Sequence, residues 1–211
     1  LAIMMEEETD ISKEEKTVLN QYMVDASHNL QLLLDNLLNW AKSQMNDHEM
    51  AKKSFDINQL IATNVKLFEE NAYRKGIIVE HVNSELSKAY ADKDMVDFII
   101  RNLLSNALKF TSKEDSITLS VVEEQESLSI KVKDTGTGMT PAQVDILLNS
   151  EEGGFTTKGT DNEVGTGLGF SIIKDFVKRN NGEIAINSVA DKGSEFIFTL
   201  PTSLTVQVLS A

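Results

Sequence analysis

The sequence predicts an α+β protein in which a helical segment, of the kind found in four-helix bundles, precedes a mixed β-sheet with helices stacked on one face. Two observations lead to this prediction. Residues 11–46 contain neither proline nor glycine and carry apolar residues at heptad spacing. After residue 55, helical periodicity alternates with short stretches in which every second residue is apolar, as half-buried strands require.

The first helix is predicted from an apolar row with alternating spacings of four and three residues. The row consists of Leu19, Met23, Ala26, Leu30, Leu33, Leu37, Trp40 and Gln44. A second row widens the apolar stripe: Leu34, Leu38, Ala41 and Met45. One helix cannot bury both rows, so we expect the segment "LAIMMEEE" and a second copy of the chain to complete a bundle. The alternative is a helix packed on the following domain of the same chain.

The elements after the polar joint "NDHEMAKKS" begin with "DINQ", which resembles a capping box and opens a helix ending near Lys75, before Gly76. "IIVEHVN" is predicted to be a strand. A helix is predicted over 94–110, strands over 117–124 and 128–134, and a short helix from Pro141. A polar, glycine-rich loop over 149–167 leads to a helix over 168–179, and "EIAINSV" and "EFIFTLP" complete the sheet.

Three domains follow from this pattern: a helical dimerisation segment at 1–50, a second domain at 51–201 and a tail or linker at 202–211. The chain has 211 residues, no cysteine and a net charge of −13. It therefore has no disulfide, thiolate metal site or cysteine nucleophile. No apolar run approaches the roughly 20 residues of a membrane span. The net charge would repel nucleic acid, so any phosphate must be captured locally by amides, a metal ion or a lysine.

The segment "NLLSNALKF" places Asn102, Asn106 and Lys109 on one helical face, while Val96, Ile100, Leu103 and Ala107 line another that should face the sheet. Two amides and an ammonium suit a hydrated Mg²⁺ ion and the phosphates that it neutralises. The alternative is a solvated polar face.

The segment "DTGTGM" ends a predicted strand with a carboxylate. Asp134 continues the apolar series of that strand, so its carboxylate should point into the core, where it needs a partner from the fold or from a ligand. It could accept a hydrogen bond from a purine amine, with Gly136 and Gly138 letting the backbone turn closely around the ring. The alternative is a tight turn with a capping Asp; aspartic protease chemistry would need a second carboxylate.

Two glycine-rich segments remain. "GTGLG" at Gly165–Gly169 stands at the start of a helix, where free amides and the helix dipole attract anions, although it fits neither the dinucleotide-binding fingerprint nor a Walker loop. "GGFTTKG" places Phe155 and Lys158 in the long loop, where a lid could carry a lysine to a terminal phosphate. The alternative for "GTGLG" is a flexible hinge.

In this order, "NLLSNALKF", "DTGTGM", "GGFTTKG", "GTGLG" and "KGSEFIFTLP" resemble the N, G1, F, G2 and G3 boxes of the ATP-binding domain of sensor histidine kinases. The resemblance covers residues 11–201. It implies a Bergerat-fold α/β sandwich preceded by the dimerisation and histidine-phosphotransfer bundle. It also implies binding of ATP with Mg²⁺ and γ-phosphoryl transfer to a histidine, then to an aspartate in the receiver domain of a response regulator.

The resemblance assigns roles to individual residues of this sequence. Asn106 resembles the Mg²⁺ ligand and Asn102 its supporting amide. Lys109 resembles a phosphate contact, Asp134 the adenine reader and Phe110 a wall of the base pocket. The remaining residues match the phosphate-facing turn and the lid: Gly165, Gly167, Leu168 and Gly169 in the turn, and Phe155 and Lys158 in the lid.

The family's phosphoacceptor motif, a histidine followed by an acidic residue and then a proline, has no match here. His28 is followed by Asn29 and is expected to be an ordinary surface histidine of the bundle; His48 and His81 have no supporting pattern. "LAIMMEEE" is interpreted as the remnant of the acceptor helix, so we expect no autophosphorylation by this chain.

Two other functions stay open. One is an ATPase of the same fold, which would use a glutamate base in the N-box helix, where only Asp94 and Asp97 are nearby acids. The other is a nucleotide-sensing dimerisation module. We expect a cytoplasmic location, a homodimer formed through the N-terminal helices and no nucleic-acid partner. A membrane anchor in the parent protein stays open.

Overall fold

The computed structural model describes residues 12, 16, 19, 23, 50–82, 88–149, 159–161 and 169–202. The chain divides into two compact units, Leu1–Asn46 and Asp47–Ala211. Most of the heptad pattern, with His28 and His48, lies outside the described residues. Of the first apolar row, Leu19 and Met23 are described; both are helical and exposed.

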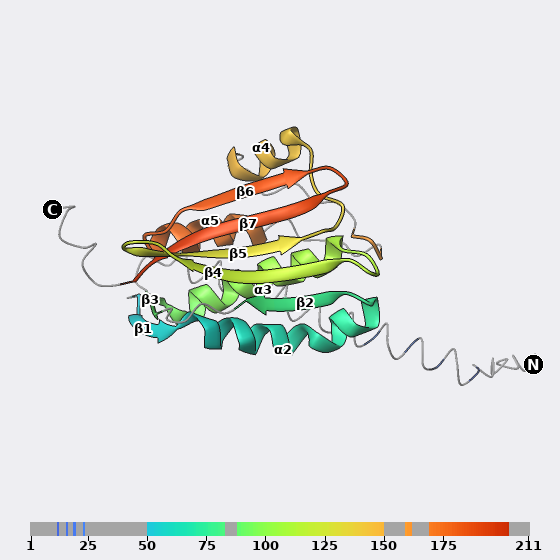
Figure 1. The fold of residues 1–211 in the computed structure, drawn as a ribbon, viewed down its shortest axis with the longest axis horizontal. Coiled ribbons are helices and arrows are strands. Elements are labelled where there is room, and N and C mark those ends of the chain that lie inside the picture. Colours follow the sequence, from blue (N-terminus) through green and yellow to red (C-terminus); the bar gives the residue numbers. More distant parts are fainter. Residues whose placement is uncertain are drawn as a thin grey trace, which may run out of the picture. The chain divides into compact units, whose positions relative to one another are not determined.

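The second unit contains a mixed five-stranded sheet in the order β2-β4-β5-β7-β6 (Figure 1). Its strands are β2 (Ile78–Val82), β4 (Ser116–Glu123), β5 (Ser127–Asp134), β6 (Ile184–Val189) and β7 (Gly193–Pro201). The β2–β4 pair is parallel, and the other three pairs are antiparallel. In this register Asp134 lies opposite Ile117.

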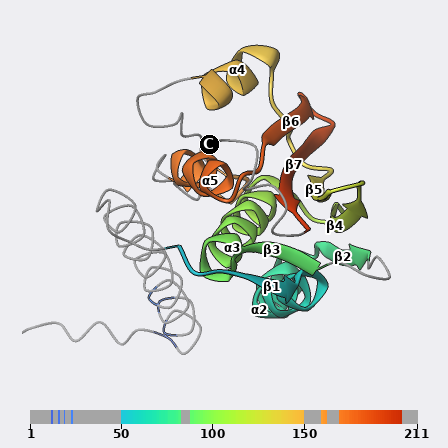
Figure 2. The ribbon, with the colours of Figure 1, turned by 90° about the vertical axis from the view of Figure 1, so that its left-hand side faces the viewer.

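The helices are α2 (Ile57–Lys75), α3 (Lys93–Phe110), α4 (Pro141–Asn149) and α5 (Gly169–Arg179). Figure 2 shows α2, α3 and α5 on one face of the sheet, as the sequence predicts. The core between these layers is apolar, and Ile99, Ile100, Leu103, Leu119 and Phe198 are fully buried in it. The short helix α4 lies beside β6.

Helix α2 confirms the predicted start and stop. Asp56 accepts hydrogen bonds from the main-chain N–H groups of Asn58 and Gln59, at 2.9 and 3.2 Å, as an N-cap residue does. Gly76 ends the helix in the left-handed region, with φ of 68°.

One prediction about the polar joint is wrong in part. Residues Lys52–Asp56 form strand β1, which pairs antiparallel with β3 (Lys88–Asp92) in a separate two-stranded sheet. Strand β1 lacks the apolar alternation of a half-buried strand, since four of its five residues are polar. Strand β3 does alternate, but the side chains that it buries are only those of Ala89 and Ala91. The pairing places Phe55 opposite Ala89, and no local sequence pattern predicts this pairing.

Helix α3 occupies the middle of the helical layer. It is flanked by α2 and α5, and the Phe98 ring meets that of Phe176 edge to face, with the centroids 5.2 Å apart. The four residues predicted to face the sheet are all buried, namely Val96, Ile100, Leu103 and Ala107. None of the helices in the described ranges has the length and apolar character needed to cross a membrane.

Candidate functional site

The polar face of α3 holds Asn102, Asn106 and Lys109, and all three are half-buried rather than fully exposed. Helix α3 begins at an N-cap, Asp92, whose carboxylate accepts from the N–H groups of Asp94 and Met95. Because the opposite face of α3 is buried in the core, Asn102, Asn106 and Lys109 are held in fixed positions relative to the sheet.

Asn102 lies against the first residue of α5. Its Nδ2 donates to the carbonyl of Phe98 at 3.0 Å, one turn earlier. A Cβ atom added at Gly169 would lie 3.0 Å from Asn102 Oδ1, so the absent side chain leaves room for this amide. Two predicted site residues from different segments are therefore neighbours.

Asn106 differs from Asn102 because its amide makes no hydrogen bond within the described part of the chain. An amide oxygen is an adequate ligand for Mg²⁺, which keeps several waters and takes its other ligands from phosphates. In the described ranges, no three His, Asp or Glu side chains gather closely enough to bind a metal ion. A single amide oxygen therefore fits a Mg²⁺ ion that arrives bound to a nucleotide. It does not fit a metal site built from several protein carboxylates.

The last turn of α3 carries Lys109 and Phe110. The Lys109 ammonium lies 4.8 Å from the centroid of the Phe110 ring, within cation–π range. The Phe110 carbonyl accepts a hydrogen bond from the N–H of Thr137 at 3.0 Å. This bond joins the end of α3 to the loop that follows β5.

Asp134, the last residue of β5, is 4% exposed. Its Oδ1 accepts hydrogen bonds from the main-chain N–H groups of Gly136, at 2.9 Å, and Ser194, at 3.2 Å. Among the described residues only Oδ1 is bonded, so Oδ2 can accept from a ligand. Burial raises the pKa of Asp134, the two amides lower this pKa, and the negative charge of Asp115 raises it further.

Gly136 and Gly138 are required by contacts within the protein. A Cβ atom at Gly136 would lie 2.1 Å from the Phe110 carbonyl oxygen, and one at Gly138 would lie 2.0 Å from that of Val189. Gly138 also has a φ of 60°, in the left-handed region that glycine favours. Each glycine therefore lets the loop after β5 pack against another segment of the chain.

Ser188 and Ser194 support this loop, and neither is predicted from the sequence. The Ser188 hydroxyl accepts a hydrogen bond from the N–H of Met139 at 2.8 Å, and the two hydroxyl oxygens are 2.9 Å apart. Ser194 lies within the segment "KGSEFIFTLP", and the match of that segment to a family box is the signal that could have identified it. Ser188 has no such signal, because its role depends on the pairing of β6 with β7.

Five predicted site residues lie outside the described residues: Phe155, Lys158, Gly165, Gly167 and Leu168. Residues 159–161, which begin at the last glycine of "GGFTTKG", are described. Thr160 donates through its N–H to the Lys109 carbonyl at 2.9 Å, which places this part of the chain at the end of α3.

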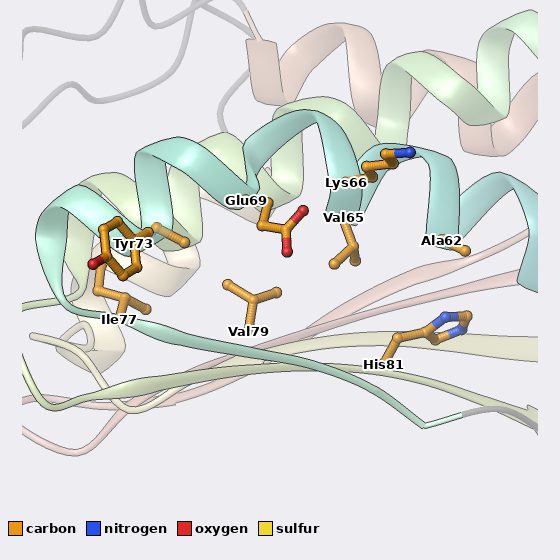
Figure 3. A pocket seen from close by; sticks show the side chains of 9 residues that line it. Ala62, Val65, Lys66, Glu69, Tyr73, Ile77, Val79 and His81 are labelled. Atoms are coloured by element: carbon orange, nitrogen blue, oxygen red, sulfur yellow. The ribbon is translucent and has the colours of Figure 1, made fainter.

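A groove of about 480 Å³ lies elsewhere, between α2 and the edge strand β2 (Figure 3). Val65, Val79 and Ile77 form its apolar part, and His81 lines it from β2. None of the predicted site residues lines this groove. Within the described ranges the His81 Nε2 is buried without a hydrogen-bond partner, and burial lowers the pKa of His81. Such a nitrogen is poorly placed to accept a phosphoryl group.

Comparison with known proteins adds an independent observation. Residues 91–204 match the family described as "Histidine kinase-, DNA gyrase B-, and HSP90-like ATPase". The chain is 28% identical over 171 residues to the adaptive-response sensory kinase SasA of Microcystis aeruginosa, an alignment that covers 80% of this chain and 44% of SasA. It is 28% identical over 188 residues to the sensor histidine kinase ZraS of Escherichia coli, covering 89% of this chain and 38% of ZraS.

Among solved structures, the chain is similar to full-length ShkA in complex with AMPPNP, with a TM-score of 0.69 and 25% identity. The match covers 92% of this chain and 40% of ShkA. This chain therefore spans less than half the length of each of these three proteins.

Proposed function

The chain belongs to the family of histidine kinase-, DNA gyrase B-, and HSP90-like ATPases, and from that premise we propose that residues 51–201 form the ATP-binding catalytic domain of a sensor histidine kinase. The fold is the mixed sheet with one helical layer of the Bergerat type. The parent protein would transfer the γ-phosphoryl group of ATP to a histidine, and then to an aspartate of a response-regulator receiver domain.

One observation carries the proposal: a carboxylate buried at the end of β5 with one oxygen held by two main-chain amides. The cost of burying a carboxylate is offset only in part by these bonds, as the raised pKa of Asp134 indicates. A ligand amine that donates to Oδ2 would complete the set of partners. The exocyclic amine of adenine is such a donor, so we assign Asp134 to adenine recognition.

The other roles follow from the same helix and loop. We assign the metal contact to Asn106, with Asn102 as its supporting amide. Bound Mg²⁺ would neutralise charge on the phosphates. Lys109 would contact the phosphates, and Phe110 would form a wall of the base pocket. Phosphoryl transfer depends mainly on positioning and electrostatics, so few further groups are needed.

The segments outside the described residues keep their proposed roles. We assign Phe155 and Lys158 to the lid and Gly165, Gly167 and Leu168 to the phosphate-facing turn. Gly169 would end that turn, and the closeness of its backbone to the Asn102 amide supports this assignment.

A hydrolytic ATPase of the same family is the second candidate, and the surroundings of Asp97 argue against it. Asp97 accepts from Asn64 Nδ2 at 2.7 Å and is paired with Arg101 at 2.6 Å. Asn64 belongs to α2 and Arg101 to the next turn of α3, so both partners hold this carboxylate within the helical layer. Asn102 lies one helical turn before Asn106 on the same face. Its neutral amide cannot act as the general base that hydrolysis by water would need.

For the helical segment we propose a homodimer. Leu19 and Met23 are 50% and 64% exposed in the single chain, and a second copy would cover them. We propose residues 1–50 as the dimerisation segment and 202–211 as a tail or linker. We also propose a cytoplasmic location, a response-regulator partner and no nucleic-acid partner. Because its sequence lacks the acceptor motif, the chain itself should not autophosphorylate.

The test is calorimetric titration of the chain with ATP and ADP, in Mg²⁺ and in EDTA. A separate phosphotransfer assay would supply an intact dimerisation and phosphoacceptor domain in trans. We expect binding of both nucleotides and transfer of phosphate to the supplied histidine. Binding with steady ATP hydrolysis and no transfer would favour the ATPase, and absence of binding would contradict both candidates.

A further inference from the structure

Lys75, the last residue of α2, reaches groups that belong to two other segments. Its Nζ donates to the Leu108 carbonyl at 3.0 Å and to Thr160 Oγ1 at 3.1 Å, and it lies 3.4 Å from Asp161 Oδ2. The Lys75 side chain is only 17% exposed. An ammonium this buried is costly unless acceptors surround it, and these three contacts supply them.

The acceptors lie at the C-terminal end of α3, where main-chain carbonyls lack partners within the helix. Lys75 satisfies the carbonyl of Leu108. Thr160 satisfies that of Lys109 through its N–H, and its hydroxyl lies 3.2 and 3.1 Å from the carbonyls of Lys109 and Thr111. A cation at this end also interacts favourably with the helix dipole.

We name these residues, Lys75, Thr160 and Asp161, the α3 clasp. It joins three parts of the chain that are distant in sequence: the end of α2, the end of α3 and residues 159–161. The turn of α3 that it closes carries Lys109 and Phe110. Their side chains therefore extend from a backbone that the clasp holds in place.

We propose that Lys75 is a positioning residue for nucleotide phosphates: it holds the last turn of α3 so that Lys109 meets them. This inference rests on the proposed function. Lys75 acts through the backbone of α3 and not as a phosphate ligand, because its ammonium is already surrounded by protein oxygens. The Phe110 carbonyl keeps its separate 3.0 Å hydrogen bond from the Thr137 N–H when the clasp is lost. Loss of the clasp should therefore weaken ligands that carry phosphates far more than it weakens binding of the base alone.

The experiment compares ATP and adenosine binding, by calorimetry and NMR titration, for the wild type, Lys75→Met and Thr160→Val. Lys75→Met keeps the length of the side chain and removes its charge and donors. Thr160→Val keeps the shape and removes the hydroxyl. Lys66→Met is the matched control, since Lys66 is an exposed lysine on the same helix. Unfolding temperatures are measured in parallel.

We expect each clasp variant to weaken ATP roughly tenfold and adenosine less than twofold, with Lys66→Met unchanged. The double variant should bind ATP no more weakly than the worse single variant, because both substitutions open one clasp. Equal losses for ATP and adenosine would indicate a merely structural role and overturn the inference, as would unchanged ATP affinity in both variants. If Lys75→Met does not fold, the ratio of ATP to adenosine affinity in Thr160→Val tests the inference alone. Absence of ATP binding by the wild type would overturn the proposed function itself, and the inference with it.

Discussion

The main-chain amide of Ser194 donates a 3.2 Å hydrogen bond to the carboxylate of Asp134, a residue 60 positions earlier in the chain. The bond crosses from β7 to the end of β5, and the amide of Gly136 donates to the same oxygen. The start of β7 thus helps to orient a buried carboxylate whose other oxygen can accept a hydrogen bond from a ligand.

Asp134→Asn should separate binding from folding. The Asn side-chain oxygen can still accept from Gly136 and Ser194, which turns its NH₂ toward the ligand, where it would oppose a donor of adenine. We expect ADP affinity to fall about 100-fold. The unfolding free energy at neutral pH should not fall, since a buried charge is removed. Calorimetry and urea unfolding measure the two quantities. A large loss of stability would mean that the carboxylate is mainly structural.

The raised pKa of Asp134 predicts opposite pH dependences for binding and stability. The carboxylate is the acceptor, so ADP affinity should fall as pH drops through a midpoint above the ordinary value of 3.8. Because its folded pKa exceeds the unfolded one, the contribution of this group to stability is full below the unfolded pKa. It is lost as pH rises through the folded pKa.

The control for this pH dependence is Asp134→Asn, which keeps every other titrating group and the phosphates of ADP. Subtracting its profile from that of the wild type isolates the carboxylate. Identical profiles for the two proteins would contradict the assignment of Asp134 to the base.

Asn106→Ala should remove most of the Mg²⁺ dependence of ATP binding. The variant loses one neutral oxygen ligand, and in Mg²⁺ we expect roughly tenfold weaker binding. In EDTA its affinity should equal that of the wild type, because no metal contact remains to be lost. Titrations in both buffers measure this. A tenfold loss in EDTA as well would show that Asn106 contacts the nucleotide directly or supports the fold.

Gly136 lies against a backbone oxygen and Gly169 against a side-chain oxygen, so the two glycines should respond differently to substitution by alanine. At Gly136 the added Cβ would meet the backbone oxygen of Phe110, which cannot move without shifting α3. We expect Gly136→Ala to lower the unfolding free energy by about 3 kcal/mol. Gly169→Ala meets only the side-chain oxygen of Asn102, so it should weaken nucleotide binding with little change in stability. Thermal unfolding and calorimetry of both variants distinguish the outcomes. Equal stability losses would contradict this contrast.

Local patterns were sufficient wherever short-range chemistry decides the structure. The cap at Asp56, the left-handed Gly76 and the period-two alternation before Asp134 each depend on neighbouring residues alone. Strand β1 was missed because four of its five residues are polar, and β3 because its alternation depends on two small residues, Ala89 and Ala91. The two strands stabilise one another through pairing. Ser188, Thr160 and Lys75 were missed for a related reason, since each acts on a segment that is remote in sequence.

The sequence by itself determined the α+β class, most elements of the second unit and the order of the glycine-rich segments, because periodicity and turn chemistry are local. It also placed a carboxylate in the core at Asp134. Only the tertiary structure decided what that carboxylate meets, namely two amides on one oxygen, and why Gly136 and Gly138 must lack side chains. Those answers depend on the approach of β7, α3 and the β6–β7 turn, which follows from burial of the whole core rather than from any one segment.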